Sequence, residues 1–278
     1  MNLPLKTSRC VLFTAIALSS FPLFSAELPP APPSIIAKGV LKAGVRCDQP
    51  PYGFIDATRS PAGVEVDMAR QIAQWLFGDA AKLDLTCVTA ENRVSQLAAG
   101  RVDLLIATLG ITPERERVID FSKPYRWGES GVLVKQGSPL KKVADLAGHT
   151  VATPKGSVQA QWFEENMPTV TTLRLNSSSD SLQALKQGRA DAYAHDGATL
   201  KMLTTKDTSV YMLDDAYQYS NTGIGLRKNE PQWKAFIDAS IDKMRSDDLF
   251  RQWINQSVPQ EITGYYINMF QNPRPDGK

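Results

Sequence analysis

One stretch of the sequence, residues 108–122, carries side chains suited to binding a small anion. Thr108 offers a hydroxyl, Gly110 lets a ligand approach the backbone closely, and Arg115 carries a planar guanidinium that can hold a carboxylate through two parallel hydrogen bonds. An apolar run at residues 102–107 leads into this stretch, and such a run is typical of a strand that is buried on both faces. The alternative is that the charged part of the stretch forms a solvated turn, since most charged runs lie at the surface.

Three further charged side chains follow predicted strands in the same way: Arg46, Arg93 and Asp196. Arg93 falls on the loop or the first helical turn after its strand. If these strands belong to facing lobes, the three side chains and Arg115 would converge on one cleft from four separate loops. Taken singly, each loop arginine is more often a surface residue than a ligand.

No arrangement of catalytic residues competes with this anion site. The sequence contains no G-x-S-x-G motif, no glycine-rich phosphate loop and no H-E-x-x-H motif. His149 is expected on a surface turn, so only His195 could serve as a base, but His195 could equally donate a hydrogen bond to a ligand or cap its strand. The histidines and cysteines are too few for a zinc site. We predict no catalytic residue, no metal and no cofactor.

Hydrophobic periodicity predicts two successive rounds of alternating strands and helices. The first round has strands at residues 40–45, 83–88 and 102–107 and helices around residues 66–76 and 94–98. The second has strands at residues 150–152, 171–175, 191–194 and 210–213 and helices at residues 157–163 and 178–187, before two closing helices at 232–244 and 248–254. Such alternation predicts a parallel α/β sheet, whose ligands bind beyond the carboxyl ends of the strands.

We therefore expect an α/β protein of two lobes, joined by two crossings near residues 131–134 and 223–226, with a cleft between the lobes. Lobe 1 would comprise residues 39–130 and 225–265, lobe 2 residues 131–224, and the C-terminal tail residues 266–278.

The N-terminus has the layout of a cleaved secretory signal peptide. Lys6 and Arg9 precede an apolar run at residues 10–24, and small residues follow, which predicts that residues 1–26 are removed on export. The proline-rich residues 27–38 predict an extended leader without structure of its own. No second apolar run is long enough to cross a membrane, so we expect the mature protein to be soluble and exported.

The charges nearly cancel once the signal is removed. The chain has 31 basic and 29 acidic residues, and the loss of Lys6 and Arg9 leaves 29 of each. Because nucleic-acid binders normally gather a basic excess on one face, we predict no nucleic-acid partner.

Two cysteines remain after cleavage, Cys47 and Cys87, and each lies at the end of a predicted strand. An even count in an oxidising compartment favours a disulfide between them, and two buried thiols are the alternative.

Taken together, these motifs resemble the periplasmic solute-binding proteins of ABC importers that carry polar amino acids, family 3. The most specific match is G-I-T-P-E-R at residues 110–115, followed by D-F-S-K-P-Y at residues 120–125, which resemble the family's T-x-x-R and F-S-x-P-Y motifs. Weaker matches lie at residues 63–67, 145–148 and 188–192. The resemblance extends from Gly39 to about Asn255 and implies the two-lobed periplasmic-binding-protein fold of type 2.

The resemblance also implies roles for the candidate residues. Arg115 would clamp the α-carboxylate of an amino acid, with help from Ser157 at a helix N-terminus. Asp196 would accept hydrogen bonds from the α-ammonium. Thr108 and the carbonyl of Gly110 would serve the same ammonium, although Gly110 replaces the hydroxyl residue that is common at its position.

Side-chain specificity would depend on Arg46 and Arg93, which are similar to residues of family members that bind glutamate and aspartate. Two arginines that face a cleft would repel each other and be costly to desolvate unless an anion lies between them, and a second carboxylate on the ligand supplies that anion. A dicarboxylate without an amine is disfavoured, because Asp196 would be left unpaired.

The function implied by this resemblance is that of a monomeric periplasmic protein that captures a polar amino acid by lobe closure and delivers it to an inner-membrane ABC permease. Glutamate and aspartate are favoured as ligands, and other polar amino acids come next. A different hypothesis is an enzyme, because dehydratases of the prephenate/arogenate type resemble these binders. A third is a sensory module that presents the ligand to a receptor.

Overall fold

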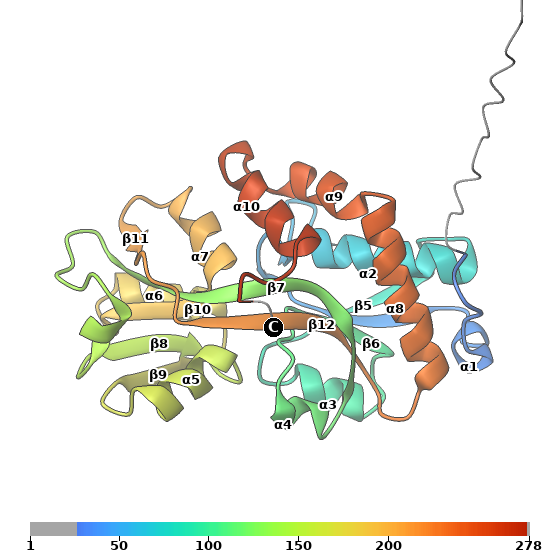
Figure 1. Ribbon diagram of the computed structural model, residues 1–278, viewed down its shortest axis with the longest axis horizontal. Coiled ribbons are helices and arrows are strands. Elements are labelled where there is room, and N and C mark those ends of the chain that lie inside the picture. The colour runs from blue at the N-terminus through green and yellow to red at the C-terminus, as the bar shows by residue number, and fades with distance from the viewer. Residues whose placement is uncertain (1–26, 277–278) are drawn as a thin grey trace, which may run out of the picture.

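The computed structural model describes residues 27–276, so the expected signal peptide at residues 1–26 lies outside the described residues. A nine-stranded sheet runs through both lobes and forms the framework of the molecule (Figure 1). Its strands follow the order β5-β1-β6-β12-β7-β10-β8-β9, and β11 also pairs with β7. The α/β architecture predicted from the sequence is confirmed.

The first lobe contains three parallel strands: β1 (Leu41–Val45), β5 (Leu83–Cys87) and β6 (Leu104–Ile106). β1 lies in the middle and pairs with both of the others. Two helices connect the three strands: α2 (Val64–Phe77) and α3 (Arg93–Ala98). Gly78 ends α2 with a φ of 70°, a left-handed conformation that glycine adopts without steric cost.

The second lobe repeats the alternation of strands and helices. Its strands are β8 (Thr150–Pro154), β9 (Thr171–Leu175), β10 (Ala192–Asp196) and β11 (Val210–Met212). Its α-helices are α5 (Val158–Asn166), α6 (Ser178–Lys186) and α7 (Gly197–Thr204), and a 3₁₀ turn, η1, spans Val143–Leu146. α7 was not expected from periodicity, because it begins directly after β10, where Asp196 caps its first turn through Thr199 N at 3.1 Å.

Two strands cross between the lobes, β7 (Asp120–Lys135) and β12 (Gln218–Leu226). They pair antiparallel to each other, and β7 continues into the second lobe, where it pairs with β10. The expected crossings at residues 131–134 and 223–226 lie within these strands, but β7 begins eleven residues earlier than expected. The hinge is therefore a two-stranded ribbon, and it places its own side chains between the lobes.

A disulfide joins Cys47 to Cys87, with their Cα atoms 5.5 Å apart. Cys87 ends β5, and Cys47 follows β1, its neighbour in the sheet. The predicted disulfide is confirmed, and it fixes the backbone next to Arg46.

Two expectations at the ends of the folded part are wrong. Within the expected extended leader, α1 (Pro33–Ile36) forms a short helix, because Ile35 is buried in the core. In place of a tail from residue 266, α10 (Gln260–Gln271) is a helix that buries Tyr266 and Phe270. Its buried residues recur at helical spacing, so the pattern was present in the sequence.

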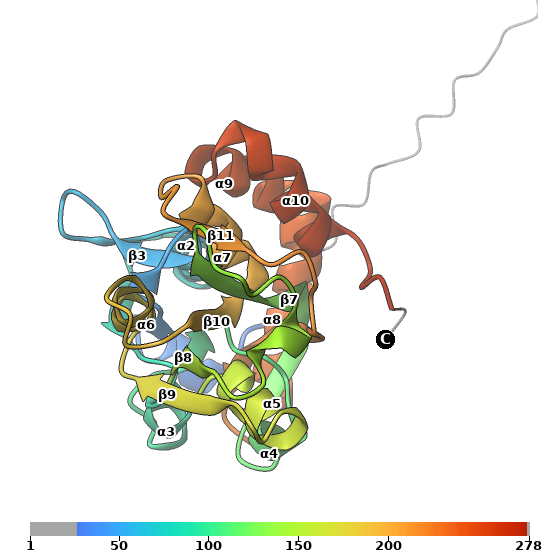
Figure 2. The ribbon, with the colours of Figure 1, turned by 90° about the vertical axis from the view of Figure 1, so that its left-hand side faces the viewer.

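The remaining elements cover the first lobe and the cleft. They comprise α8 (Pro231–Ser246), α9 (Leu249–Ser257), the short helix α4 (Pro113–Glu116), and a small separate sheet of β2 (Asp48–Gln49), β3 (Gly53–Ile55) and β4 (Pro61–Ala62). Figure 2 shows α9 and α10 on the opposite side of the sheet from α3 and α4.

Several apolar clusters form the core, and the largest contains residues of the first lobe, of α10 and of α7 in the second lobe. Tyr266 packs in the core of the first lobe while its hydroxyl donates to Ala198 O of α7 at 2.5 Å. Tyr265 donates to Glu129 Oε1 of β7 at 2.6 Å. The C-terminal helix therefore contacts the first lobe, the crossing ribbon and α7.

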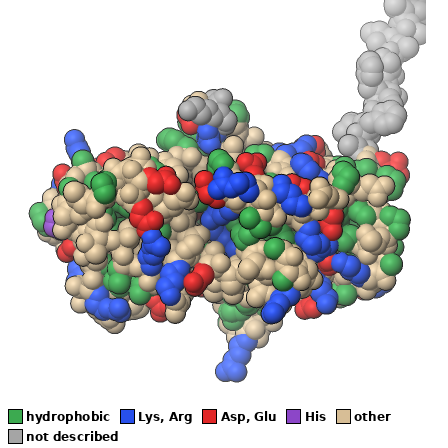
Figure 3. Space-filling model, turned by 90° about the horizontal axis from the view of Figure 1, so that it is seen from below, with side chains coloured by type: hydrophobic (Ala, Val, Ile, Leu, Met, Phe, Trp, Pro, Cys, Tyr) green, Lys and Arg blue, Asp and Glu red, His purple; other side chains and the backbone are tan. Residues whose placement is uncertain are grey.

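The surface carries both signs of charge. On the face formed by α3, α4 and α5, basic and acidic side chains are interspersed over both lobes (Figure 3). Among residues 27–276, the helices lack the combination of length and hydropathy that a bilayer span requires.

Candidate ligand-binding site

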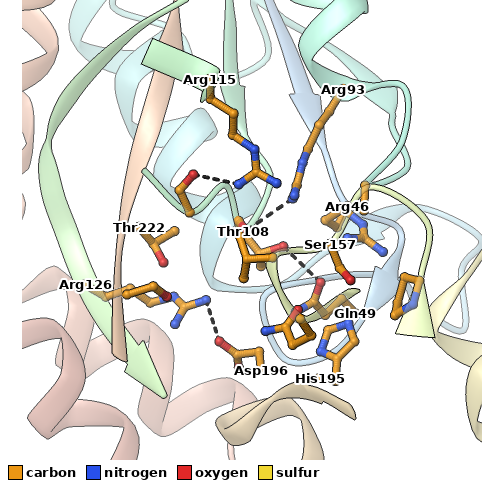
Figure 4. Close-up of a pocket in the computed structure, with 16 residues that line it drawn as sticks. Arg46, Gln49, Arg93, Thr108, Arg115, Arg126, Ser157, His195, Asp196 and Thr222 are labelled. Carbon is orange, nitrogen blue, oxygen red and sulfur yellow. Dashed lines mark hydrogen bonds and ion pairs between the residues drawn. The ribbon is translucent and has the colours of Figure 1, made fainter. Parts of the chain in front are cut away.

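A cavity lies between the lobes, next to the crossing ribbon, and all of the candidate site residues line it (Figure 4). Its volume, counted as space open to the centre of a water molecule, is about 40 Å³. The predicted residues on its wall are Arg46, Arg93, Thr108, Gly110, Arg115, Ser157, His195 and Asp196. Five polar residues that sequence reasoning missed also line it: Gln49, Arg126, Gln159, Ser220 and Thr222. The fold thus brings both lobes and the crossing ribbon to one small space.

Arg115 is held at the mouth of the cavity by α4 and reaches across the cleft. Its Nη1 donates to Gly110 O at 2.7 Å, and its Nη2 donates at 3.0 Å to Gly156 O, which belongs to the second lobe. Burial lowers the pKa of Arg115 to about 10, although nearby Glu114 acts in the opposite direction. Among the described residues, no carboxylate forms a salt bridge with this guanidinium, so it is available to a ligand carboxylate.

Arg93 begins α3 and is 3% exposed. Its Nη1 donates to the carbonyls of Ala107 and Thr108 at 2.5 and 3.2 Å, while its buried Nε has no partner among the described atoms. Burial, and then the charges of Arg115 and Arg46, hold the pKa of Arg93 well below its usual value. Arg93 is therefore a second buried cation whose partners are neutral carbonyls.

Arg46 differs from the expectation, because it already has a carboxylate partner. Its Nε and Nη2 donate to the two oxygens of Asp48 at 2.9 and 2.8 Å, a paired geometry that leaves little positive charge unbalanced. Asp48 also accepts from Ser178 N of the second lobe at 3.2 Å. The prediction that a ligand anion must balance Arg46 is corrected, since Asp48 lies only two residues away and does so.

Asp196 is also paired, with an arginine that was not predicted. Arg126 of β7 places Nη2 at 3.1 Å from Asp196 Oδ2 (Figure 4). Its guanidinium also lies 4.2 Å from the centre of the Tyr52 ring. Burial alone would lower the pKa of Arg126, but Asp196 and the neighbouring tyrosines raise it above its usual value. The expectation that Asp196 would be unpaired without a ligand ammonium is wrong.

Thr108 is fixed by groups of the first lobe, one of which also contacts the second lobe. Its φ is +49°, and its N–H donates to both carboxylate oxygens of Glu65 at 3.0 Å. Its hydroxyl donates to Gln49 Oε1 at 2.9 Å, and the Gln49 amide donates to Thr199 of α7 at 3.0 Å. Glu65 is fully buried, which raises its pKa, and it also accepts from Tyr125 OH at 2.5 Å. This network orients the strand end that carries Thr108 and Gly110.

Ser157 and His195 come from the second lobe. Ser157 caps α5 by accepting from Ala160 N at 3.2 Å, so the helix N-terminus points to the cavity wall. The ring of His195 contacts Ser178 Oγ through Nε2 at 3.1 Å, and its Nδ1 has no partner among the described atoms. Burial lowers the pKa of His195 to about 4, which makes it a neutral hydrogen-bonding group and a poor base at neutral pH.

Gln49 and Arg126 gave no motif signal. Gln49 lies on β2, which is only two residues long, and no periodicity can reveal so short a strand. Arg126 follows the expected F-S-x-P-Y motif directly, and its place on β7, opposite Thr222 of β12, would have been deducible only from the full length of that strand.

Comparison with known proteins shows that the chain is similar to solute-binding proteins. The model of the family "Bacterial extracellular solute-binding proteins, family 3" matches residues 41–256. The ABC transporter glutamine-binding protein GlnH of Bacillus subtilis (strain 168) is 31% identical over 219 residues, which are 77% of this chain and 80% of that protein.

Solved structures show the same likeness. A solute receptor for L-cysteine of Neisseria gonorrhoeae superimposes with a TM-score of 0.80 at 26% identity, over 88% of this chain and 97% of that one. An ancestral amino-acid-binding protein, described as a precursor of cyclohexadienyl dehydratase, gives 0.75 at 25% identity, over 81% and 98%. These proteins share a scaffold and differ in the ligands that their names state.

Proposed function

The chain belongs to the bacterial extracellular solute-binding proteins, family 3, with the type 2 periplasmic-binding-protein fold, and we propose that its ligand is an acidic amino acid, glutamate or aspartate. It would be the periplasmic component of an ABC amino-acid importer and deliver this ligand to the membrane permease.

The observation that carries this proposal is the excess of arginine around the cavity. Four arginines line it, and they face one lining carboxylate, Asp196, and one carboxylate behind the lining, Asp48. Even if buried Glu65 is counted as ionised, one positive charge remains unbalanced. A ligand of net negative charge balances it, whereas a neutral or basic amino acid does not.

The two arginines without a carboxylate partner define where the ligand carboxylates would bind. Arg115, with Ser157 and the N-terminus of α5 opposite, suits the α-carboxylate. Arg93 suits the side-chain carboxylate. Thr108 and Asp196 would lie near the ammonium. Arg46 would contribute mainly to the shape of the cavity wall, because Asp48 balances its charge.

Capture would occur by closure around the crossing ribbon. Among the described residues, polar contacts that join the lobes beside the cavity include Arg115 with Gly156, Asp48 with Ser178, and Gln49 with Thr199. A ligand carboxylate that binds Arg115 and α5 together would bridge both lobes and favour the closed form, which a permease would recognise.

A ligand panel tests this proposal. Mature protein, unfolded and refolded to release bound ligand, is titrated by calorimetry with glutamate, aspartate, glutamine, arginine, cysteine and cystine. We expect the acidic pair to bind most tightly. Binding of glutamine, cysteine or arginine without binding of either acidic amino acid would refute it.

Two substitutions separate the carboxylate sites. Arg115→Ala should abolish binding of every amino acid, because loss of a buried charge pair commonly costs about 2–5 kcal/mol. Arg93→Ala should weaken glutamate and aspartate selectively.

The enzyme hypothesis has no support from the site. A dehydratase needs an acid or base beside a substrate carbon, and His195, the histidine on the lining, has a pKa near 4. We expect no product when the protein is incubated with prephenate or arogenate.

A further inference from the structure

The ion pair between Arg126 and Asp196 is built into the hinge. Arg126 lies opposite Thr222 in the register of the crossing ribbon, and its side chain is 1% exposed. The Tyr52 ring covers its guanidinium at 4.2 Å. The cation therefore cannot turn away from Asp196 without losing its packing.

Gly128 provides the space for this pair. A Cβ at residue 128 would lie 2.8 Å from Arg126 Nη1 and 3.1 Å from Asp196 Oδ2. Residues 126 and 128 share one face of β7, because side chains alternate along a strand. A side chain at position 128 would displace one partner or both.

Protein groups already occupy both oxygens of Asp196. Oδ1 accepts from the N–H and hydroxyl of Thr199 at 3.1 and 3.3 Å, and Oδ2 lies 3.1 Å from Arg126 Nη2. A ligand ammonium that approached Asp196 would also approach the Arg126 cation. Its attraction to the acid would be largely cancelled by repulsion from the arginine, because the pair as a whole is neutral.

We propose that Arg126 is a specificity-determining residue: as the internal counter-ion of Asp196, it lets the site bind dicarboxylates that lack an α-amino group. This inference rests on the proposed binding of an anionic ligand. A site that depends on a ligand NH group rejects analogues without it by a factor on the order of 10⁴, because its buried acceptor is left unpaired. Here the acceptor stays paired when the amine is absent.

The test compares L-glutamate with glutarate, the same five-carbon dicarboxylate without the amine, by calorimetry on the refolded mature chain. Wild-type protein should bind glutarate within about tenfold of L-glutamate. In Arg126→Gln the gap should widen beyond about a hundredfold, because Asp196 then needs the ammonium. In Asp196→Asn the gap should close or reverse, because Arg126 is left without its acid.

Each comparison is the ratio of the affinities for glutarate and L-glutamate, measured on one protein preparation. Partial unfolding of a variant lowers both affinities equally and leaves the ratio unchanged. If Arg126→Gln does not fold, the wild-type ratio and Asp196→Asn decide. A wild-type gap wider than tenfold, or an unchanged ratio in both variants, overturns the counter-ion proposal. If glutarate binds and neither acidic amino acid does, the proposed function fails and the counter-ion proposal stands. If no anionic ligand binds, both fail.

Discussion

Gly156 lies where the two lobes touch, and replacing it with alanine should disfavour closure without removing a ligand contact. It is on the loop between β8 and α5, with a φ of +70°. A Cβ there would lie 2.8 Å from Ala90 O and 2.9 Å from Glu91 Cα, both backbone atoms of the first lobe. Since backbone cannot yield as a flexible side chain does, the lobes would have to separate.

The free-energy cost of Gly156→Ala has two parts. The left-handed backbone costs an alanine about 1–2 kcal/mol, and this cost applies whether the lobes are open or closed. The clash applies only to the closed form, where overpacking costs about 1–3 kcal/mol. If the ligand binds only the closed form, this second part weakens binding about 5- to 150-fold.

Gly148→Ala is the matched control. Gly148 belongs to the same lobe and has a φ of +79°, but a Cβ added to it would have no heavy atom of the described residues within 4 Å beyond its chain neighbours. Both variants should lose similar stability in urea unfolding of the ligand-free protein. Calorimetry with L-glutamate should show weaker binding for Gly156→Ala alone.

Equal affinities for Gly156→Ala and Gly148→Ala would refute this reasoning. That result would mean that the ligand binds without bringing Gly156 against residues 90–91. The radius of gyration, measured by small-angle X-ray scattering with ligand present, would distinguish binding without lobe closure from a local shift of the loop that carries Gly156.

Three other predictions concern stability. Between pH 7 and pH 5, the free energy of unfolding of the wild-type protein should fall by about 2 kcal/mol more than that of His195→Gln, as measured by urea unfolding at both pH values. The reason is that buried His195 stays neutral down to its folded pKa of about 4, whereas in the unfolded chain it takes up a proton below its ordinary pKa of 6.5, which favours the unfolded state. Replacing Cys47 and Cys87 together by serine should lower the free energy of unfolding by about 2–4 kcal/mol, for a loop with a sequence separation of 40, and added reductant should have no effect on that variant. Phe270→Ala should cost about 3–5 kcal/mol in chemical denaturation, whereas a residue in an unstructured tail would cost almost nothing.

The sequence predicted several strand ends well, because the apolar run of β6 leads to Thr108 and β10 ends at a charged residue. Thr108, Arg115 and Asp196 were found in this way, and all three line one cavity. The partners of these residues were harder to predict. Arg126 and Asp196 are 70 residues apart, and only the pairing of β7 with β10 brings their backbones together.

The error on Arg46 has a different origin. Asp48 lies two residues away, so the pair was visible in the sequence, but residues 46 and 48 share a face only if the chain stays extended after β1. The prediction treated this segment as a loop. The C-terminal tail was also predicted wrongly. The apolar residues of α10 recur at helical spacing, but the surface that buries them forms only in the folded protein.

The lining arginines differ in how a ligand bound to them would contact the second lobe, and this difference separates closure from selectivity. Arg46 and Arg93 belong to the first lobe and Arg126 to the crossing ribbon, so a carboxylate bound by them gains similar energy whether the lobes are open or closed. Arg115 differs, because its Nη2 reaches Gly156 O in the second lobe. A carboxylate that replaces this contact and also accepts from the N-terminus of α5 gains its full energy only when the lobes meet. Only such differential binding shifts the equilibrium towards closure. The α-carboxylate, which every amino acid carries, would therefore drive closure. The charge balance of the other three arginines would decide which amino acids bind tightly.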